Sequence, residues 1–410
     1  MKRWIAYSFL MACTAAMADE FLAPDLPPRD VVRSWLLQDP VVREAQSGVS
    51  AAGHDAGMLR ASPNEWTVNA TGQRRTYGGN TPSREWNVGI ERTFRLPGKR
   101  QLDGRLGDVE IALGESRYDQ ALRDAKHDLV DLWLDWRGAA ETAVLVDDQV
   151  TLAKSNRDVV EKRLKAGDAA KLDLNVADTD LADIDRVRSE ARTNETKARA
   201  RLTARFSDVK ADAGRLSDPA PFAEPVDFWK EQLLQRNPAL RTAEAERERA
   251  TLGATRARAD RAPDPTIGVF SASEAFSNER IIGLSLSVPL SGSYRSQKMA
   301  RALDAADQTE AALARMRQRV EAEAIELYSD AVGGHERWQL STKTALRTSE
   351  NVRLTQRAYS LGEVDLQTLL ITQRQSLDTA RIALQAQVDA LRARYRLLID
   401  SGRLWSDVGG

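Results

Sequence analysis

Few residues of this chain have the types and spacing needed for catalysis or metal binding. Its only histidines are His54, His127 and His335, and its only cysteine is Cys13. They lie far apart in the sequence and lack the short spacing of metal ligands. No Ser–His–Asp order and no pair of catalytic carboxylates stands out in so charged a chain. We therefore expect no metal site, no cofactor and no enzymatic activity.

Two further features exclude common ligand classes. Gly98-Lys99-Arg100 lacks the upstream glycine and the following serine or threonine of a phosphate-binding loop, so it is better interpreted as the end of a strand and the start of a helix. The 59 basic residues are balanced by 60 acidic ones. That balance gives no support for a nucleic-acid partner.

The N-terminus has the pattern of a secretory signal peptide. Lys2 and Arg3 precede an apolar run that ends in the small-residue cleavage site Ala16-Met17-Ala18, so residues 1–18 are expected to be removed on export. Leu10-Met11-Ala12-Cys13 also resembles a lipoprotein cleavage box, which leaves lipidation of Cys13 open as the alternative. Beyond these residues the sequence has no apolar run long enough for a transmembrane helix.

An internal repeat organises the rest of the chain. Asp39-Pro40-Val41-Val42-Arg43 returns as Asn237-Pro238-Ala239-Leu240-Arg241, and Arg163-Leu164-Lys165-Ala166-Gly167 returns as Ala358-Tyr359-Ser360-Leu361-Gly362. Because the offset is nearly constant, the chain is interpreted as a duplication. The expected parts are an N-terminal extension at 19–30, a first repeat at 31–206, a linker at 207–226, a second repeat at 227–399 and a tail at 400–410.

Each repeat is predicted to contain a helix, two strands, a very long helix and a second helix. Apolar residues that alternate with polar ones, as in Trp86, Val88 and Ile90, predict strands. A 4-3 spacing of apolar residues predicts helices packed side by side. Breaks in the long helices are expected near Trp136-Arg137-Gly138 and Gly333-Gly334. The expected strands are 64–75, 84–96, 264–274 and 280–290, and the expected long helices are 99–166, 169–206, 294–361 and 364–398.

The strands have a physical consequence. Four strands are too few to close a membrane barrel, because known barrels begin at eight. An open sheet edge cannot face lipid, where each unpaired backbone group costs several kcal/mol. If these strands enter a membrane, several copies of the chain must share one barrel. A four-stranded sheet in a soluble periplasmic domain remains the alternative.

The order of elements resembles the TolC-type outer-membrane efflux factors over nearly the whole mature chain. The resemblance rests on the duplication and on the two hairpin motifs that end in Gly167 and Gly362. The stretch Leu96-Pro97-Gly98-Lys99-Arg100 is similar to that of the heavy-metal cation branch of this family. Members of that branch are the outer-membrane components of resistance-nodulation-division systems. The resemblance implies a mainly α fold and a homotrimer in the cell outer membrane. It also implies a twelve-stranded β-barrel that the three copies share in outer-membrane lipid. This barrel would continue into an α-helical tunnel that crosses the periplasm.

From this resemblance we expect a passive exit duct of a tripartite efflux system. Its partners would be a periplasmic adaptor and an inner-membrane transporter, and its cargo would be metal cations, with drugs and secreted peptides left open. The alternative function is a periplasmic adaptor or coiled-coil scaffold without a pore, which two duplicated strand pairs disfavour. An exported hydrolase is disfavoured by the missing catalytic constellation.

Candidate functional residues lie at the helix reversals and in the strands. Glycine at a reversal suits a left-handed helix cap, and the family implies that these hairpin ends dock the adaptor. The expected docking residues are Arg163, Leu164, Gly167, Leu361 and Gly362. The aromatic residues Trp66, Trp86 and Phe94 are expected at the membrane interface.

Two acids follow the reversals and have two possible roles. Asp173 and Asp365 lie in first helical turns, where the helix dipole favours a carboxylate. Threefold symmetry would instead place them in rings that constrict the pore and attract cations. The family often carries paired acids where this chain has Thr368 and Ile371, so an identical gate is in doubt.

Overall fold

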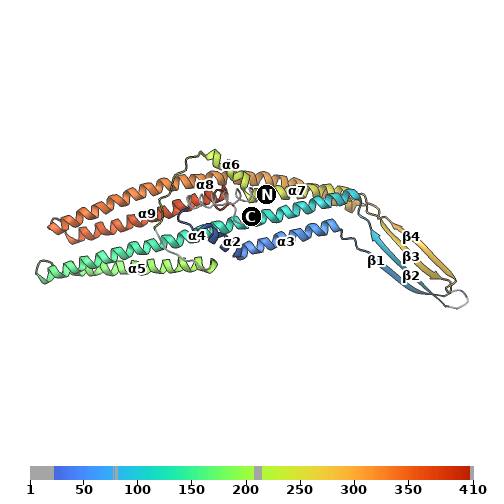
Figure 1. Ribbon diagram of the computed structural model, residues 1–410, viewed down its shortest axis with the longest axis horizontal. Helices are drawn as coiled ribbons and strands as arrows, with labels where there is room; N and C mark the ends of the chain where they lie inside the picture. Colours follow the sequence, from blue (N-terminus) through green and yellow to red (C-terminus); the bar gives the residue numbers. More distant parts are fainter. Residues whose placement is uncertain (1–22, 77, 79–81, 207–214, 407–410) are drawn as a thin grey trace, which may run out of the picture. The chain divides into compact units, whose positions relative to one another are not determined.

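The computed structural model describes residues 23–76, 78, 82–206 and 215–406. The signal peptide expected at 1–18, with Cys13, lies outside the described residues. So do the start of the N-terminal extension, part of the expected linker and the last residues of the tail. The described chain is mainly helical and has one small antiparallel sheet (Figure 1).

The same order of elements occurs twice. The first series is α2 (Arg29–Gln38), α3 (Pro40–Ala61), β1 (Thr67–Thr76), β2 (Pro82–Thr93), α4 (Pro97–Lys165) and α5 (Lys171–Arg205). The second series is α6 (Val226–Arg236), α7 (Pro238–Ala259), β3 (Thr266–Glu274), β4 (Glu279–Ser287), α8 (Ser293–Leu361) and α9 (Leu366–Asp400). Matching helices have equal lengths: 22 residues in α3 and α7, 69 in α4 and α8, and 35 in α5 and α9.

The breaks expected in the two long helices are wrong. Both α4 and α8 continue through their glycines without interruption. A Cβ atom at Gly138 would lie 2.8 Å from Val388, and one at Gly334 would lie 3.3 Å from the Cα atom of Ala390. These glycines therefore allow α9 to approach α4 and α8 closely, which is a packing requirement and not a helix stop.

The chain divides into two units, which we name by their content. The hairpin unit comprises Met1–Arg43, Ala121–Asn237 and Val320–Gly410, and the sheet unit comprises Glu44–Gln120 and Pro238–Arg319. No helix among the described residues is both long and apolar enough to cross a membrane.

The hairpin unit is held together by the apolar seam expected along α9. All but two of the residues at this 4-3 spacing are buried, the exceptions being the half-buried Ala380 and Leu384. The buried ones are Leu366, Leu370, Gln373, Leu377, Val388, Leu391, Tyr395 and Leu398. Leu377 joins a cluster with Val146 and Val150 of α4 and with Ile184 of α5. The 4-3 spacing thus places one stripe of α9 against the α4–α5 hairpin, as in a coiled coil.

The segments that precede α2 and follow α9 also pack into the hairpin unit. The carboxylate of Asp25 accepts hydrogen bonds from Tyr395 Oη at 2.6 Å and from the Ser217 hydroxyl at 2.7 Å. Trp405 is buried, and Lys126 Nζ donates to its carbonyl at 2.8 Å. Residues outside the two repeats therefore form part of the same core.

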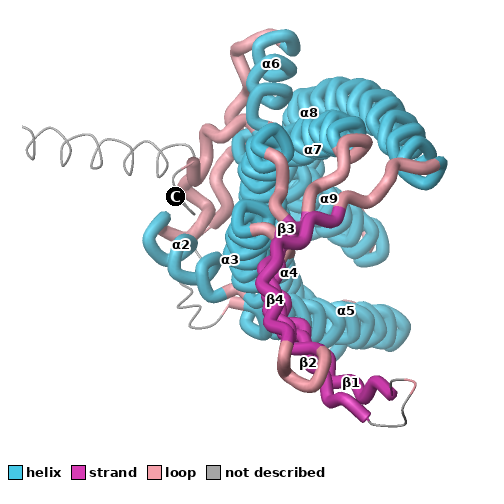
Figure 2. The backbone as a smooth tube through the Cα atoms, turned by 90° about the vertical axis from the view of Figure 1, so that its right-hand side faces the viewer, coloured by secondary structure: helices cyan, strands magenta, loops and turns pink. Residues whose placement is uncertain are grey.

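The sheet has the order β1-β2-β3-β4, and all neighbouring strands are antiparallel. The β2–β3 pairing joins the two repeats, from Trp86↔Ser273 to Thr93↔Thr266. At the last pair the two threonine hydroxyls are 2.8 Å apart. The strands extend beyond the helix ends to which they are joined (Figure 1), and the side chains of the outer strands β1 and β4 are almost all exposed. Figure 2 shows the same four strands side by side in the view along the helices.

Candidate functional site

The two faces of the sheet differ in polarity. Paired residues share a face and successive residues alternate, so the register assigns every side chain. One face, here called the apolar face, carries large exposed side chains: Val68, Trp86, Val88, Ile90, Ile267, Val269, Ile282, Leu284 and Leu286. The other face, here called the polar face, carries mainly Thr, Asn, Gln, Ser and Glu. Leu284 is 81% exposed, which is unfavourable for an apolar side chain in water.

The sheet is also open at both edges. Within the described residues β1 pairs only with β2, and β4 pairs only with β3. Each outer strand therefore presents a row of unpaired backbone N–H and C=O groups. An exposed apolar face between two unpaired edges is an incomplete surface that can be completed by further strands of the same kind.

The three predicted interface aromatics lie at two ends of the strands. Trp66 and Phe94 flank β1 and β2 at the helical end, where their rings meet edge to face with centroids 6.4 Å apart. The Arg92 guanidinium lies over the Trp66 ring at 5.5 Å. Trp86 lies in β2 on the apolar face, opposite Gly72. All three are exposed, as a membrane-interface role requires.

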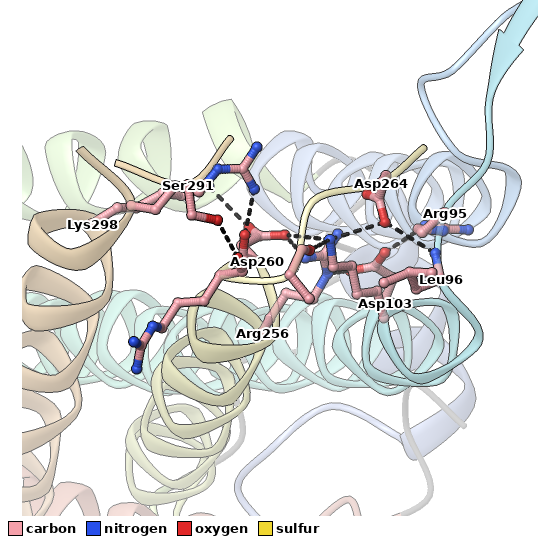
Figure 3. Close-up of polar contacts among 12 residues, drawn as sticks. Arg95, Leu96, Asp103, Arg256, Asp260, Asp264, Ser291 and Lys298 are labelled. Atoms are coloured by element: carbon pink, nitrogen blue, oxygen red, sulfur yellow. Dashed lines mark hydrogen bonds and ion pairs between the residues drawn. The ribbon is translucent and has the colours of Figure 1, made fainter. Parts of the chain in front are cut away.

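A network of ion pairs joins the strands to the helices of the sheet unit (Figure 3). Lys99, in the first turn of α4, is buried and donates to the carbonyl of Ala262 at 2.7 Å and to Asp264 Oδ1 at 2.9 Å. The same oxygen accepts from the backbone N–H of Leu96 at 3.0 Å. Lys99 therefore ties the β2–α4 connection of one repeat to the α7–β3 connection of the other.

Asp103 and Asp260 extend this network. Asp103 pairs with Arg95 at 2.5 Å and with Arg256 at 2.6 Å. Asp260 pairs with Arg256 and lies 3.2 Å from Lys298 Nζ. Burial alone would raise the pKa of Asp260, but the hydrogen bonds and charges of Arg256 and Lys298 outweigh it and lower that pKa. The motif that resembles the heavy-metal branch thus has a structural role in this chain.

Both hairpin ends of the hairpin unit close with the same backbone motif. Gly167 and Gly362 have φ of +82° and +78°. Gly167 donates to the carbonyl of Leu164 at 3.0 Å, and Asp168 donates to that of Arg163 at 2.8 Å. Gly362 and Glu363 repeat this pattern after α8. This is the Schellman arrangement, which needs a residue that accepts positive φ at little cost.

The first hairpin end contacts the second. Arg163 Nε pairs with Asp168 at 3.1 Å, and its guanidinium lies 5.6 Å from the centroid of the Tyr359 ring. Below this contact an apolar cluster joins Val160 and Ala177 to Leu366 and Leu370 of α9. The structure therefore places Arg163 of the first hairpin next to Tyr359, which lies two residues before Leu361 in the second hairpin.

Leucines remain exposed at these ends. Leu361 is 58% exposed and Leu172, at the start of α5, is 69% exposed, whereas Leu164 is half-buried. Leu172 was not among the docking residues expected from the sequence, because its 4-3 spacing with Val176 predicts a packed seam position instead.

Asp173 and Asp365 both cap helices. Asp173 Oδ2 accepts from the backbone N–H of Ala170 at 3.1 Å, and Asp365 Oδ1 accepts from that of Thr368 at 2.8 Å. Hydrogen bonds from the Thr368 hydroxyl and backbone N–H lower the pKa of Asp365. The capping role is thus present at both positions, and a pore-constricting role stays a prediction.

A second polar contact links the hairpins along α5 and α9. Arg374 of α9 pairs with Asp180 at 3.1 Å and with Asp183 at 3.6 Å, both in α5. Burial raises the pKa of Asp180, although Arg374 opposes this. Arg374 was missed in the sequence because no spacing rule relates α9 to α5.

The histidines have ordinary surroundings. His54 is exposed in α3, His127 Nε2 lies 2.6 Å from Asp400, and His335 packs near Trp338 with centroids 5.5 Å apart. Across residues 23–406 as far as they are described, no group of three or more His, Cys, Asp or Glu side chains is placed to hold a metal ion.

Comparisons with known proteins define the class of fold. No family model and no curated protein matches the sequence. The outer-membrane channel OprN matches with 22% identity and a TM-score of 0.77, over 92% of this chain and 91% of that chain. The CmeC outer-membrane channel of Campylobacter jejuni matches with 14% identity and a TM-score of 0.76, over 91% and 85%. CusC, which undergoes conformational changes during folding and transmembrane channel formation, matches with 14% identity and a TM-score of 0.72, over 91% of both.

The chain therefore has the fold of an outer-membrane channel protomer. More narrowly, the resemblance to the TolC-type channels that the sequence indicated is confirmed at the level of the fold.

Proposed function

We propose that this protein is the outer-membrane exit duct of a tripartite efflux system. The observation that carries the proposal is the four-stranded sheet, whose apolar face is exposed and whose two edges are unpaired, on a chain with the fold of outer-membrane channels. Such a sheet becomes stable in lipid when copies pair edge to edge into one closed cylinder. Three copies would supply twelve strands.

In this arrangement the apolar face meets lipid and the polar face lines the pore. The hairpins of α4–α5 and α8–α9 would form a tunnel in the periplasm. Their ends would dock a periplasmic adaptor through Arg163, Leu164, Gly167, Leu361 and Gly362, together with the exposed Leu172. Asp173 and Asp365 lie near these ends and could ring the pore there, in addition to capping their helices.

The duct would perform no chemistry of its own. An inner-membrane transporter would supply the energy, and the adaptor would favour the open packing of the hairpin ends over the closed one. Metal cations are the cargo that the Leu96–Arg100 motif favours, and drugs or secreted peptides are the other candidates. Because the Lys99 ammonium is engaged in structural ion pairs with Asp260 and Asp264, Lys99 would not itself bind the cargo.

Membrane fractionation and conductance test the proposal. The mature protein is expected in the outer-membrane fraction as a heat-modifiable trimer that conducts ions across a planar bilayer. A deletion strain would then be tested for sensitivity to a panel of metals and drugs to identify the cargo. A monodisperse monomer that stays in the periplasmic fraction and conducts nothing would overturn the channel in favour of an adaptor or scaffold.

A further inference from the structure

Three arginines of the sheet have no partner in the part of the chain that the structure describes. Arg74 in β1, Arg84 in β2 and Arg280 in β4 are exposed, and no hydrogen bond or ion pair to their side chains is present there. Arg92, at the other end of β2, differs because it donates to the carbonyl of Asn64 at 3.0 Å and lies over Trp66.

The three arginines share one face and one end of the sheet. Arg74 is directly opposite Arg84. Both lie on the same face as Trp86, which is two residues after Arg84 in β2. Arg280 lies on this face too, because it is opposite Ser273 and Ser273 is opposite Trp86. All three therefore lie on the apolar face, near the end of the sheet where β1 is followed by β2 and β3 by β4. We name them the arginine rim.

The carboxylates at this end lie on the polar face. Glu85 accepts from Gln73 at 2.8 Å and pairs with Arg75 at 3.3 Å, and Arg75 also reaches Glu274 at 3.5 Å. Glu85 lies on the same face as Ser83 and Asn87. The arginine rim lies on the opposite face, because Arg84 alternates with these residues along β2. The sheet thus separates its charges at this end: Glu85 and Glu274 share Arg75 on the polar face, whereas the three arginines have no carboxylate on their own face.

An uncompensated pair of like charges directly across two strands is destabilising. Arg74 and Arg84 are such a pair, with Cβ atoms about 5 Å apart in this geometry. Guanidinium groups side by side form a site for an oxyanion, because each presents two parallel N–H donors. A ligand with phosphate groups would remove the repulsion and satisfy these donors.

The position of the rim indicates where that ligand lies, and this step rests on the proposed function. From Arg84 to Arg92 the strand rises about 26 Å at ~3.3 Å per residue, which at a strand tilt of about 40° spans about 20 Å of the roughly 25 Å apolar band of an outer-membrane barrel. The helices leave from the Arg92 end, so the arginine rim would lie at the outer leaflet. We propose that the arginine rim binds the phosphate groups of phosphorylated lipid headgroups in that leaflet.

Lipid binding by the purified full-length protein tests this proposal. The detergent-solubilised protein is titrated with diphosphorylated lipid A and with the same lipid after dephosphorylation. One basic residue near an anionic membrane surface changes affinity by about fivefold. The variant R74Q/R84Q/R280Q should therefore bind the diphosphorylated lipid on the order of 100-fold more weakly, while its weak binding of the dephosphorylated lipid stays unchanged.

Control variants keep the result interpretable. R301Q/R315Q/R317Q removes three exposed charges from α8 and should leave lipid binding unchanged. R74K/R84K/R280K keeps the charge but loses the paired donors, so its affinity should be intermediate. An excess of inorganic phosphate should compete weakly, because it lacks the acyl chains that the adjacent apolar face would contact.

Two results would overturn the proposal. One is equal affinity of the native protein for the phosphorylated and dephosphorylated lipids, and the other is equal affinity of the native protein and the glutamine variant. Planar-bilayer conductance separates this failure from failure of the proposed function. A protein that conducts as a trimer but ignores lipid phosphate contradicts only the arginine rim, whereas a protein that does not conduct contradicts the channel.

Discussion

The guanidinium of Arg163, near the end of α4, lies 5.6 Å from the centroid of the Tyr359 ring in α8. It joins two hairpins that no local sequence pattern connects. Arg163 also pairs with Asp168 across its own turn, so its guanidinium is held in place for the ring. Cation–π contacts at exposed sites stabilise by about 0.5–1 kcal/mol.

Removal of the Tyr359 ring should therefore loosen the contact between the hairpin ends. If the protein forms the proposed channel, Y359L should raise its open probability in planar bilayers by about two- to fivefold, the factor that corresponds to this energy. Y359F keeps the ring and loses only the hydroxyl, which also interacts with Arg163, so it should lie closer to the native protein than Y359L does. Equal open probability in the native protein and Y359L would show that this contact does not hold the ends together.

The reversal glycines give a stability prediction with a control of opposite sign. Gly167 and Gly362 have positive φ, and no heavy atom lies within 4 Å of a Cβ added at either position. G167A and G362A should each lower the free energy of unfolding by about 1–2 kcal/mol, since only the left-handed conformation is penalised. Gly253, in the interior of α7, also has open space, so G253A should stabilise by up to ~1 kcal/mol. Denaturant melts of the three variants would show this difference in sign.

The ion-pair network around Asp260 gives a pH dependence. The pKa of Asp260 is lowered in the folded protein, so its stabilising contribution is full above the ordinary carboxyl pKa of about 4. That contribution is lost as the pH falls through the lower folded value. D260N should thus melt at a lower temperature than the native protein at pH 6 and at a similar temperature near pH 2.

D304N, at an exposed aspartate of α8, serves as the matched control for this experiment. Its melting temperature should follow that of the native protein at every pH. If the difference between D260N and the native protein were constant from pH 6 to pH 2, titration of Asp260 would not be its cause.

Local patterns were sufficient to predict much of the fold. The alternation in β2 and the 4-3 spacing in α9 each give a single element one apolar side, so periodicity alone identifies them. The same reasoning failed at Gly138 and Gly334. The backbone freedom of glycine led to the prediction of a helix break. In the structure the missing side chain instead leaves room for Val388 and Ala390 of α9 to pack against these positions. A contact with a distant helix leaves no local signal.

The candidate site was predictable to a similar extent. Gly167 and Gly362 each occupy a helix end that needs a positive φ. The repeated motif that ends in glycine was sufficient to predict this local conformation. Lys99 could be seen in the sequence, but its partners Ala262 and Asp264 become its neighbours only through the β2–β3 pairing. The arginine rim likewise needs the register, because Arg74 and Arg75 are adjacent in sequence and lie on opposite faces.

Arg374 provides the last prediction, at the contact between α5 and α9. Its guanidinium pairs with Asp180 and Asp183, and it is about half exposed, so the pairs are worth at most ~1 kcal/mol after screening by solvent. If the protein forms the proposed channel and the hairpins separate when it opens, R374A should favour the open packing by up to about fivefold and conduct more than the native protein. High salt should narrow the difference in conductance between R374A and the native protein, because it screens the native pairs.

R353A is the matched control. It removes an exposed arginine whose ion pair among the described residues is with Glu350 of its own helix, and it should leave conductance unchanged. If R374A conducts like R353A at low salt, the pairs of Arg374 do not stabilise the closed packing. The apolar cluster of Val160, Ala177, Leu366 and Leu370 would then be the contact that does.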